Sequence, residues 1–172
     1  MLAAIAGLLK DDYAGETTSG PWAGSPFSWI LKRSSEQRRR IGKQLVVAWC
    51  AAKGLKVTPS GDPEADRVIA GRRVTIRSST LWKTGIYRFR RIRDEDYQYA
   101  ICLGISPFDA HCWLIPKELL KKRVMAATRQ RRRRESSGFS LSVRPAQPQE
   151  WLRACGGTLS QALAPLRRPS TT

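Results

Sequence analysis

Two apolar runs near the middle of the chain constrain its fold more than any other feature. Residues 99–105 read YAICLGI and residues 112–116 read CWLIP, and both runs are almost continuously apolar. A strand that is covered on one face alternates apolar and polar residues, whereas a continuous apolar run is typical of a strand buried on both faces. The intervening residues 106–110, SPFDA, predict a turn. The two runs therefore predict neighbouring strands buried on both faces of a sheet.

A long helix is predicted before these strands. Ser34 or Ser35 can cap its start, and Gly54 can end it in the left-handed conformation. Between these limits, apolar residues recur with helical spacing at Ile41, Leu45, Trp49 and Ala52. A second helix is predicted over residues 117–134, because Pro116 suits a helix start and apolar residues follow on one side.

Short strand-like segments separate the first helix from the apolar runs. They cover residues 55–58, 67–69 and 74–77, and Gly71 lies in a tight turn between the last two. The order of helix, three strands, crossover, two buried strands and helix predicts an α/β fold with a central mixed sheet flanked by helices.

The chain is long enough for one domain with a substantial core, because it has 172 residues and 41% of them are hydrophobic. We expect residues 1–33 to form an irregular N-terminal arm, because Gly, Pro, Ser and Thr separate its aromatic residues. Residues 34–166 are predicted to form a single α/β domain, and residues 167–172 a disordered tail.

The charge of the chain indicates a polyanionic partner. Lys and Arg number 31 against 14 Asp and Glu, which gives a formal charge of +17. So much like charge destabilises a compact state unless a polyanion neutralises it. Nucleic acid is the leading candidate, ahead of an anionic membrane surface, and DNA is preferred to RNA. The apolar start, MLAAIAGLLK, lacks the basic region of a secretory signal and is too short to span a bilayer. We therefore expect a soluble intracellular protein, either cytoplasmic or associated with the nucleoid.

Basic and hydroxyl residues are the candidates for phosphate contacts. A basic run on a helix can also be a solvated face, but such a run without interleaved acids favours phosphate binding. Aromatic residues at Trp82, Tyr87 and Phe89 lie among these cations, which is typical either of base stacking or of core packing. The predicted nucleic-acid contacts are Arg38, Arg39, Arg40, Lys43, Ser78, Ser79, Lys83, Arg88, Arg90, Arg131 and Arg132.

The hairpin over residues 64–80, EADRVIAGRRVTIRSST, contains a candidate site for chemistry. Asp66 begins the first strand, and Thr75 and Arg77 are two residues apart on the second. Because residues i and i+2 of a strand share a face, Asp66 can face both of them. A carboxylate in such a position can hold Mg²⁺ for phosphodiester hydrolysis. The four scattered cysteines and the single histidine do not have the spacing of a zinc site.

Residues 34–117, with their basic helix, Asp66 hairpin, VTIRSST strand and two buried strands, resemble the PD-(D/E)xK, or restriction-endonuclease-like, nuclease superfamily. The resemblance implies a restriction-endonuclease-like core. It also implies Mg²⁺ or Mn²⁺ bound by an Asp and a second acid, with a Lys that orients or activates water. Carried onto this chain, the first acid falls on Asp66, the second on Thr75 and the Lys on Arg77.

Two of these three positions depart from the pattern. Thr75 offers a neutral oxygen, which is a weaker magnesium ligand than a carboxylate, and Arg77 cannot lose its proton near neutral pH. Glu64 is a second candidate metal ligand, because it lies two residues before Asp66.

Three functions are compatible with these observations. The leading prediction is a divalent-metal-dependent DNA endonuclease that acts through Asp66, Thr75 and Arg77, and the other two functions are alternatives to it. The second is a catalytically inactive DNA-binding subunit of a larger nucleoprotein or nuclease complex, which the changes at Thr75 and Arg77 favour. The third is a basic RNA-binding protein. Cleavage of both DNA strands would require a homodimer or a second nuclease, because a single site of this superfamily cuts one strand.

Overall fold

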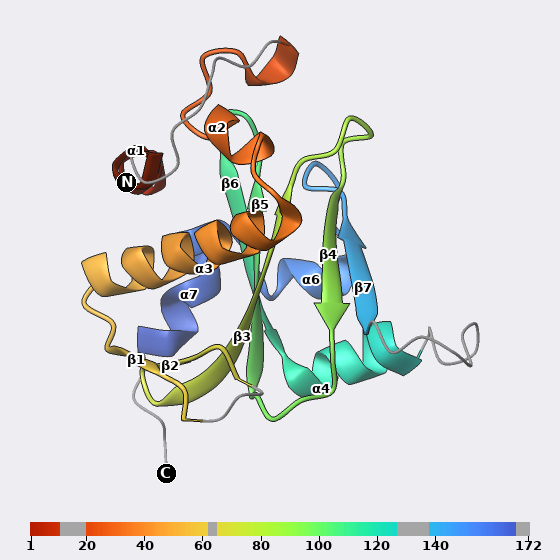
Figure 1. The fold of residues 1–172 in the computed structure, drawn as a ribbon. Helices are drawn as coiled ribbons and strands as arrows, with labels where there is room; N and C mark the ends of the chain where they lie inside the picture. The colour runs from red at the N-terminus through yellow and green to blue at the C-terminus, as the bar shows by residue number, and fades with distance from the viewer. Residues whose placement is uncertain (11–19, 62–64, 127–137, 168–172) are drawn as a thin grey trace.

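A central mixed sheet organises the protein (Figure 1), for which the computed structural model describes residues 1–10, 20–61, 65–126 and 138–167. Its six strands lie in the order β1-β2-β3-β5-β6-β8. β3 and β5 are parallel, and the other neighbouring pairs are antiparallel. The predicted α/β fold with a mixed sheet flanked by helices is confirmed. The strands are β1 (Val57–Pro59), β2 (Arg67–Ile69), β3 (Arg72–Thr80), β5 (Tyr99–Ile105), β6 (Ala110–Pro116) and β8 (Gly156–Gly157).

The two apolar runs form the neighbouring strands β5 and β6 in the interior of the sheet, and both strands are buried on both faces, as predicted. They pair in an antiparallel register that places Ile101 opposite Leu114. Ile101 and Leu103 belong to the hydrophobic core on one face of the sheet, whereas Ala100 and Cys102 belong to the core on the other. Because successive side chains of a strand point to opposite faces, the continuous apolar sequence supplies both cores.

The first core lies between the sheet and a group of helices (Figure 1). The longest is α3 (Ser35–Ala52), which the Ser34 side chain caps through the N–H of Gln37 and which Gly54 follows with φ +77°. α3 packs closely on β3, because a Cβ added to Gly42 would lie 2.1 Å from Oγ of Ser78. The other helices of this group are α1 (Leu2–Lys10), α2 (Ser28–Leu31) and α7 (Leu159–Leu163).

The second core lies under a separate two-stranded sheet formed by β4 (Tyr87–Ile92) and β7 (Phe139–Val143). Tyr87 and Phe89 are fully buried there, so core packing accounts for these two aromatic residues. The predicted second helix begins as α4 (Lys117–Leu120) and continues as a π-helical turn, η3 (Lys121–Met125). α6 (Glu150–Arg153) follows β7 in the chain.

The two ends of the chain differ from the sequence-based expectation. Residues 2–10 of the predicted irregular arm form α1, and the arm also contains the short helical turn η2 (Gly20–Trp22). Trp22 and Trp29 are buried and attach the described part of the arm to the first core. At the other end, η4 (Ala164–Arg167) includes the first residue of the predicted tail, and residues 168–172 lie outside the described residues.

Candidate nucleic-acid interface

Asp66 lies at the start of the β2–β3 hairpin and is held by the residues opposite it. One carboxylate oxygen, Oδ2, accepts hydrogen bonds from the Thr75 hydroxyl at 3.0 Å and from the backbone N–H of Ile76 at 2.7 Å. The Arg77 guanidinium donates to the same oxygen at 3.1 Å. The structure thus brings together the three residues that the hairpin pattern placed on one face.

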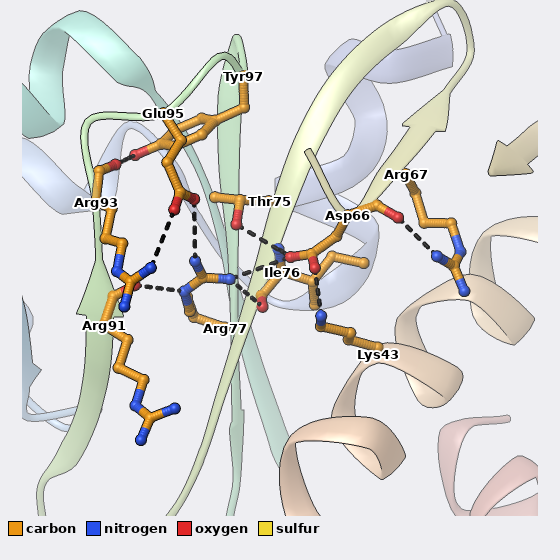
Figure 2. Close-up of polar contacts among 10 residues, drawn as sticks. All are labelled: Lys43, Asp66, Arg67, Thr75, Ile76, Arg77, Arg91, Arg93, Glu95 and Tyr97. Atoms are coloured by element: carbon orange, nitrogen blue, oxygen red, sulfur yellow. Dashed lines mark hydrogen bonds and ion pairs between the residues drawn. The ribbon is translucent and has the colours of Figure 1, made fainter. Parts of the chain in front are cut away.

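Two cations neutralise the Asp66 carboxylate (Figure 2). Lys43 reaches it from α3 and pairs with Oδ1, while Arg77 pairs with Oδ2. Arg77 also lies 3.9 Å from a carboxylate oxygen of Glu95, so its guanidinium stands between two acids. Its Nε donates to the backbone carbonyl of Arg91 at 3.0 Å. We call the residues Lys43, Asp66, Thr75, Arg77 and Glu95 the Asp66 cluster.

The environment of Asp66 favours its charged form. Burial alone would raise the pKa of the Asp66 carboxyl, but the hydrogen bond from the Ile76 N–H and the charges of Lys43 and Arg77 outweigh that effect. The pKa of Asp66 is therefore lowered below its ordinary value. A carboxylate with this set of donors remains ionised at neutral pH.

The residues of the Asp66 cluster do not fit the divalent metal ion that the family resemblance implies. Mg²⁺ needs several oxygen ligands with free lone pairs. The Asp66 carboxylate is instead surrounded by donors, and the Arg77 guanidinium separates it from the acid of Glu95. Within the described residues, no three His, Cys, Asp or Glu side chains are grouped so that they could hold a metal ion. Glu64, the other predicted ligand, lies outside the described residues.

A groove of about 470 Å³ lies beside the Asp66 cluster, between the start of α3 and the strands β3 and β4. None of the described residues that line it is acidic. Ile30 and Ile105 contribute apolar surface, and Ser35, Ser78 and Ser79 contribute hydroxyl groups. Six lining residues are arginines, and we call this surface the arginine groove: Arg38, Arg39, Arg77, Arg88, Arg90 and Arg91.

Most of these arginines have no counterion among the residues that the structure describes. Arg77 belongs to the Asp66 cluster and pairs with acids. Among the described residues, no carboxylate lies within ion-pair distance of the remaining groove arginines Arg38, Arg39, Arg88, Arg90 and Arg91. Uncompensated guanidinium groups that line one concave surface favour an anion with several negative charges, and planar guanidinium groups suit phosphate.

A bulge in β4 explains why Arg90 and Arg91 both reach this surface. Simple alternation along YRFRRI would bury residue 91, but the pairing of β4 with β7 shifts register between Phe89 and Ile92. Arg91 has φ +58°, and both arginines are exposed. A bulge inserts an extra residue and redirects the side chains near it. Sequence reasoning missed Arg91, although a charged residue in a position that alternation would bury is a signal for a bulge.

The structure divides the predicted nucleic-acid contacts into three groups. Those that line the arginine groove are Arg38, Arg39, Ser78, Ser79, Arg88 and Arg90. Three others do not line it, and of these Lys43 pairs with Asp66 and Arg40 pairs with Glu36 at 4.0 Å. The third is Lys83, in the turn between β3 and β4. Arg131 and Arg132 lie outside the described residues.

Trp82 is the one aromatic residue in the described part of the groove lining. Its side chain is 42% exposed, and the guanidinium carbons of Arg88 and Arg90 lie 4.7 and 5.6 Å from its ring centroid. Both distances are typical of cation–π contacts. The groove therefore combines positive charge with an accessible indole.

Among solved structures, the chain is similar to a bacterial homing endonuclease, I-Ssp6803I. The TM-score is 0.48 and the sequence identity is 19%, and the match covers 72% of this chain and 87% of the endonuclease chain. The chain matches no protein-family model and no curated protein. Membership of the PD-(D/E)xK superfamily therefore stays a prediction. Because the similarity is this low, the function of the chain has to be inferred from its own residues.

None of the helices in the described ranges is both long enough and apolar enough to cross a bilayer.

Proposed function

We propose that this chain is a DNA-binding protein that holds the phosphate backbone in the arginine groove and that its Asp66 cluster is structural. In this proposal the chain serves as a non-catalytic subunit of a larger nucleoprotein or nuclease assembly. The observation that carries the proposal is a groove whose described lining contains six arginines and no acid. DNA is chosen over RNA because the chain resembles a superfamily of DNA-cleaving enzymes.

The electrostatics of the groove support phosphate binding. Five of the arginines have no described carboxylate within ion-pair distance, and the chain carries a formal charge of +17. α3, which begins at Ser35 beside the groove, also directs the positive end of its dipole toward this surface. Each neutralised phosphate releases counterions and contributes about 0.9 to the slope of log affinity against log salt. Contacts by these five arginines would give a slope of about −4 to −5.

The alternative is the metal-dependent endonuclease. One observation favours it, because Asp66, Thr75 and Arg77 lie together at the hairpin where the family resemblance expects the active site. The contacts of Asp66 oppose it, since a metal ion would have to displace Lys43 and Arg77 from the carboxylate. The geometry therefore favours binding without cleavage by this chain.

The test is to measure binding and cleavage in the same samples. Labelled single- and double-stranded DNA and RNA of one sequence are incubated with the protein in Mg²⁺, in Mn²⁺ or in EDTA. We expect DNA binding that weakens steeply with salt, needs no metal and leaves the strands intact. Metal-dependent cuts that disappear in Asp66→Ala would establish the endonuclease instead. Consistently tighter binding of RNA would establish the third function.

A further inference from the structure

We infer that Trp82 forms a stacking platform for one unpaired base, so that the arginine groove prefers single-stranded or locally unpaired DNA to a continuous duplex. This inference rests on the proposed function and specifies the class of nucleic acid that the groove recognises. The observations that support it are that the indole ring lines the groove, is partly exposed and is in contact with two arginines.

The interior of the protein contains the other aromatic residues of this region. Tyr87 and Phe89 follow Trp82 closely in the sequence, but both are fully buried in the second core. Trp82 remains 42% exposed and lines the groove. A single exposed apolar residue is common on protein surfaces, but this indole lines a positively charged groove, where a base can stack on it.

The backbone holds Trp82 in a defined position. The N–H of Trp82 donates to the carbonyl of Ile86 at 2.9 Å, and the N–H of Gly85 donates to the carbonyl of Trp82 at 2.9 Å. Gly85 adopts φ +73°, which suits glycine in a tight turn. The indole is thus presented by a closed hairpin between β3 and β4, so little ordering is required on binding.

Two guanidinium groups contact the indole ring and could bind the phosphate of a base that stacks on it. Arg88 and Arg90 alternate along β4 and both lie over the indole of Trp82, while they also line the groove. A base that stacks on the indole would have its own phosphate within the reach of these cations. Aromatic side chains combined with a cationic groove are the usual means of binding single strands.

A base inside a continuous duplex is not available to such a platform. Its two faces are already stacked on neighbouring base pairs, and unstacking it costs a few kcal/mol. An unpaired base does not carry this cost. The platform therefore creates a preference for unpaired DNA, whereas the arginines bind the phosphates of either form.

The experiment compares three DNA ligands of related sequence: a continuous duplex, the same duplex with one central unpaired thymine, and the single strand. Their affinities are measured for the wild type, Trp82→Ala, Trp82→Phe and Phe108→Ala. Phe108 is a matched control, because it is an exposed aromatic residue, 67% exposed, that does not line the groove. Thermal unfolding of each variant tests whether the fold is retained.

We expect Trp82→Ala to weaken binding of the single strand and of the bulged duplex by about 5- to 150-fold. Binding of the continuous duplex should change by no more than about twofold, and Trp82→Phe should restore most of the lost affinity, because it keeps a ring. Phe108→Ala should bind all three ligands as the wild type does. This pattern would support the platform.

Two results would overturn the inference while leaving the proposed function intact. Equal weakening of all three ligands by Trp82→Ala would mean that the indole only positions Arg88 and Arg90. Unchanged binding of all three would mean that the ring contacts no base. A wild-type protein that binds none of the three DNA ligands would instead refute both the inference and the proposed function.

Discussion

The Asp66 cluster and the arginine groove lie side by side and share Arg77, yet they use positive charge in opposite ways. In the cluster, Lys43 and Arg77 are paired with acids and partly buried. In the groove, Arg38, Arg39 and Arg88 face an open surface without a described counterion. Paired cations stabilise the protein itself, whereas unpaired cations are available to a ligand. We therefore expect the first region to contribute to stability, and we propose the second for binding.

The largest effect is expected from removing charge in the groove. The triple variant Arg39→Gln, Arg88→Gln and Arg90→Gln should weaken DNA binding by about 100-fold at moderate salt, at about 1 kcal/mol for each phosphate contact. The salt slope should fall by about 3. Fluorescence anisotropy titrations at several salt concentrations would measure both quantities.

The matched control for the groove is the neighbouring arginine of α3. Arg40→Gln removes the same charge one residue from Arg39, but Arg40 does not line the groove and pairs with Glu36. We expect a smaller loss for Arg40→Gln than for Arg39→Gln alone. Equal losses would show that binding depends on net charge and not on the groove.

A substitution in the Asp66 cluster should lower the stability of the protein without weakening DNA binding. Asp66→Ala leaves Lys43 and Arg77 without their shared acid, and should lower the free energy of unfolding by about 2 to 3 kcal/mol. DNA affinity should stay unchanged or rise, because Lys43 loses its counterion and Arg77 keeps only Glu95. Urea unfolding and DNA titration of the same sample would measure the two effects.

Asp96→Ala is the control for this change, because Asp96 forms an exposed ion pair with Arg73. Exposed pairs contribute less than about 1 kcal/mol, so the loss should be small. A stable Asp66→Ala protein that no longer binds DNA would contradict the division between the two regions.

Gly42 tests whether both regions depend on the contact of α3 with β3. A methyl group in Gly42→Ala would meet the Ser78 side chain, so the helix or the serine must move. We expect a loss of about 1 to 2 kcal/mol in unfolding free energy. The double variant Gly42→Ala with Ser78→Gly should recover most of it, and full stability of Gly42→Ala alone would show that the contact is easily relieved.

The smallest expected effect is a pH dependence of the contribution that Asp66 makes to the free energy of unfolding. Because the pKa of Asp66 is lowered by folding, its contribution is fully present above the unfolded value of about 3.9. The contribution is lost as the pH falls from there through the lower pKa of the folded state. The pKa of Asp94 is lowered too, against the effect of burial, by Lys117 and Lys121. The relevant measurement is therefore the difference between wild type and Asp66→Ala, which should shrink as the pH falls below about 4.

Sequence reasoning was most successful where one local rule decides the outcome. The capping by Ser34 and the helix end before Gly54 follow from the chemistry of those two residues alone. The apolar runs at 99–105 and 112–116 are enough to predict that these strands are buried, because a strand that is apolar on both faces must be covered on both. The facing of Asp66 with Thr75 and Arg77 follows from the period of a strand.

The sequence by itself therefore determined the α/β class, the central strands, the hairpin and the excess of positive charge. Only the tertiary structure decided which cations are paired. Lys43 approaches Asp66 from α3, a contact between residues 23 positions apart in the chain. The β4 bulge adds Arg91 to the groove, and the β3–β4 turn leaves Trp82 exposed while Tyr87 and Phe89 are buried. Such contacts depend on how distant segments pack, and no local period or propensity encodes them.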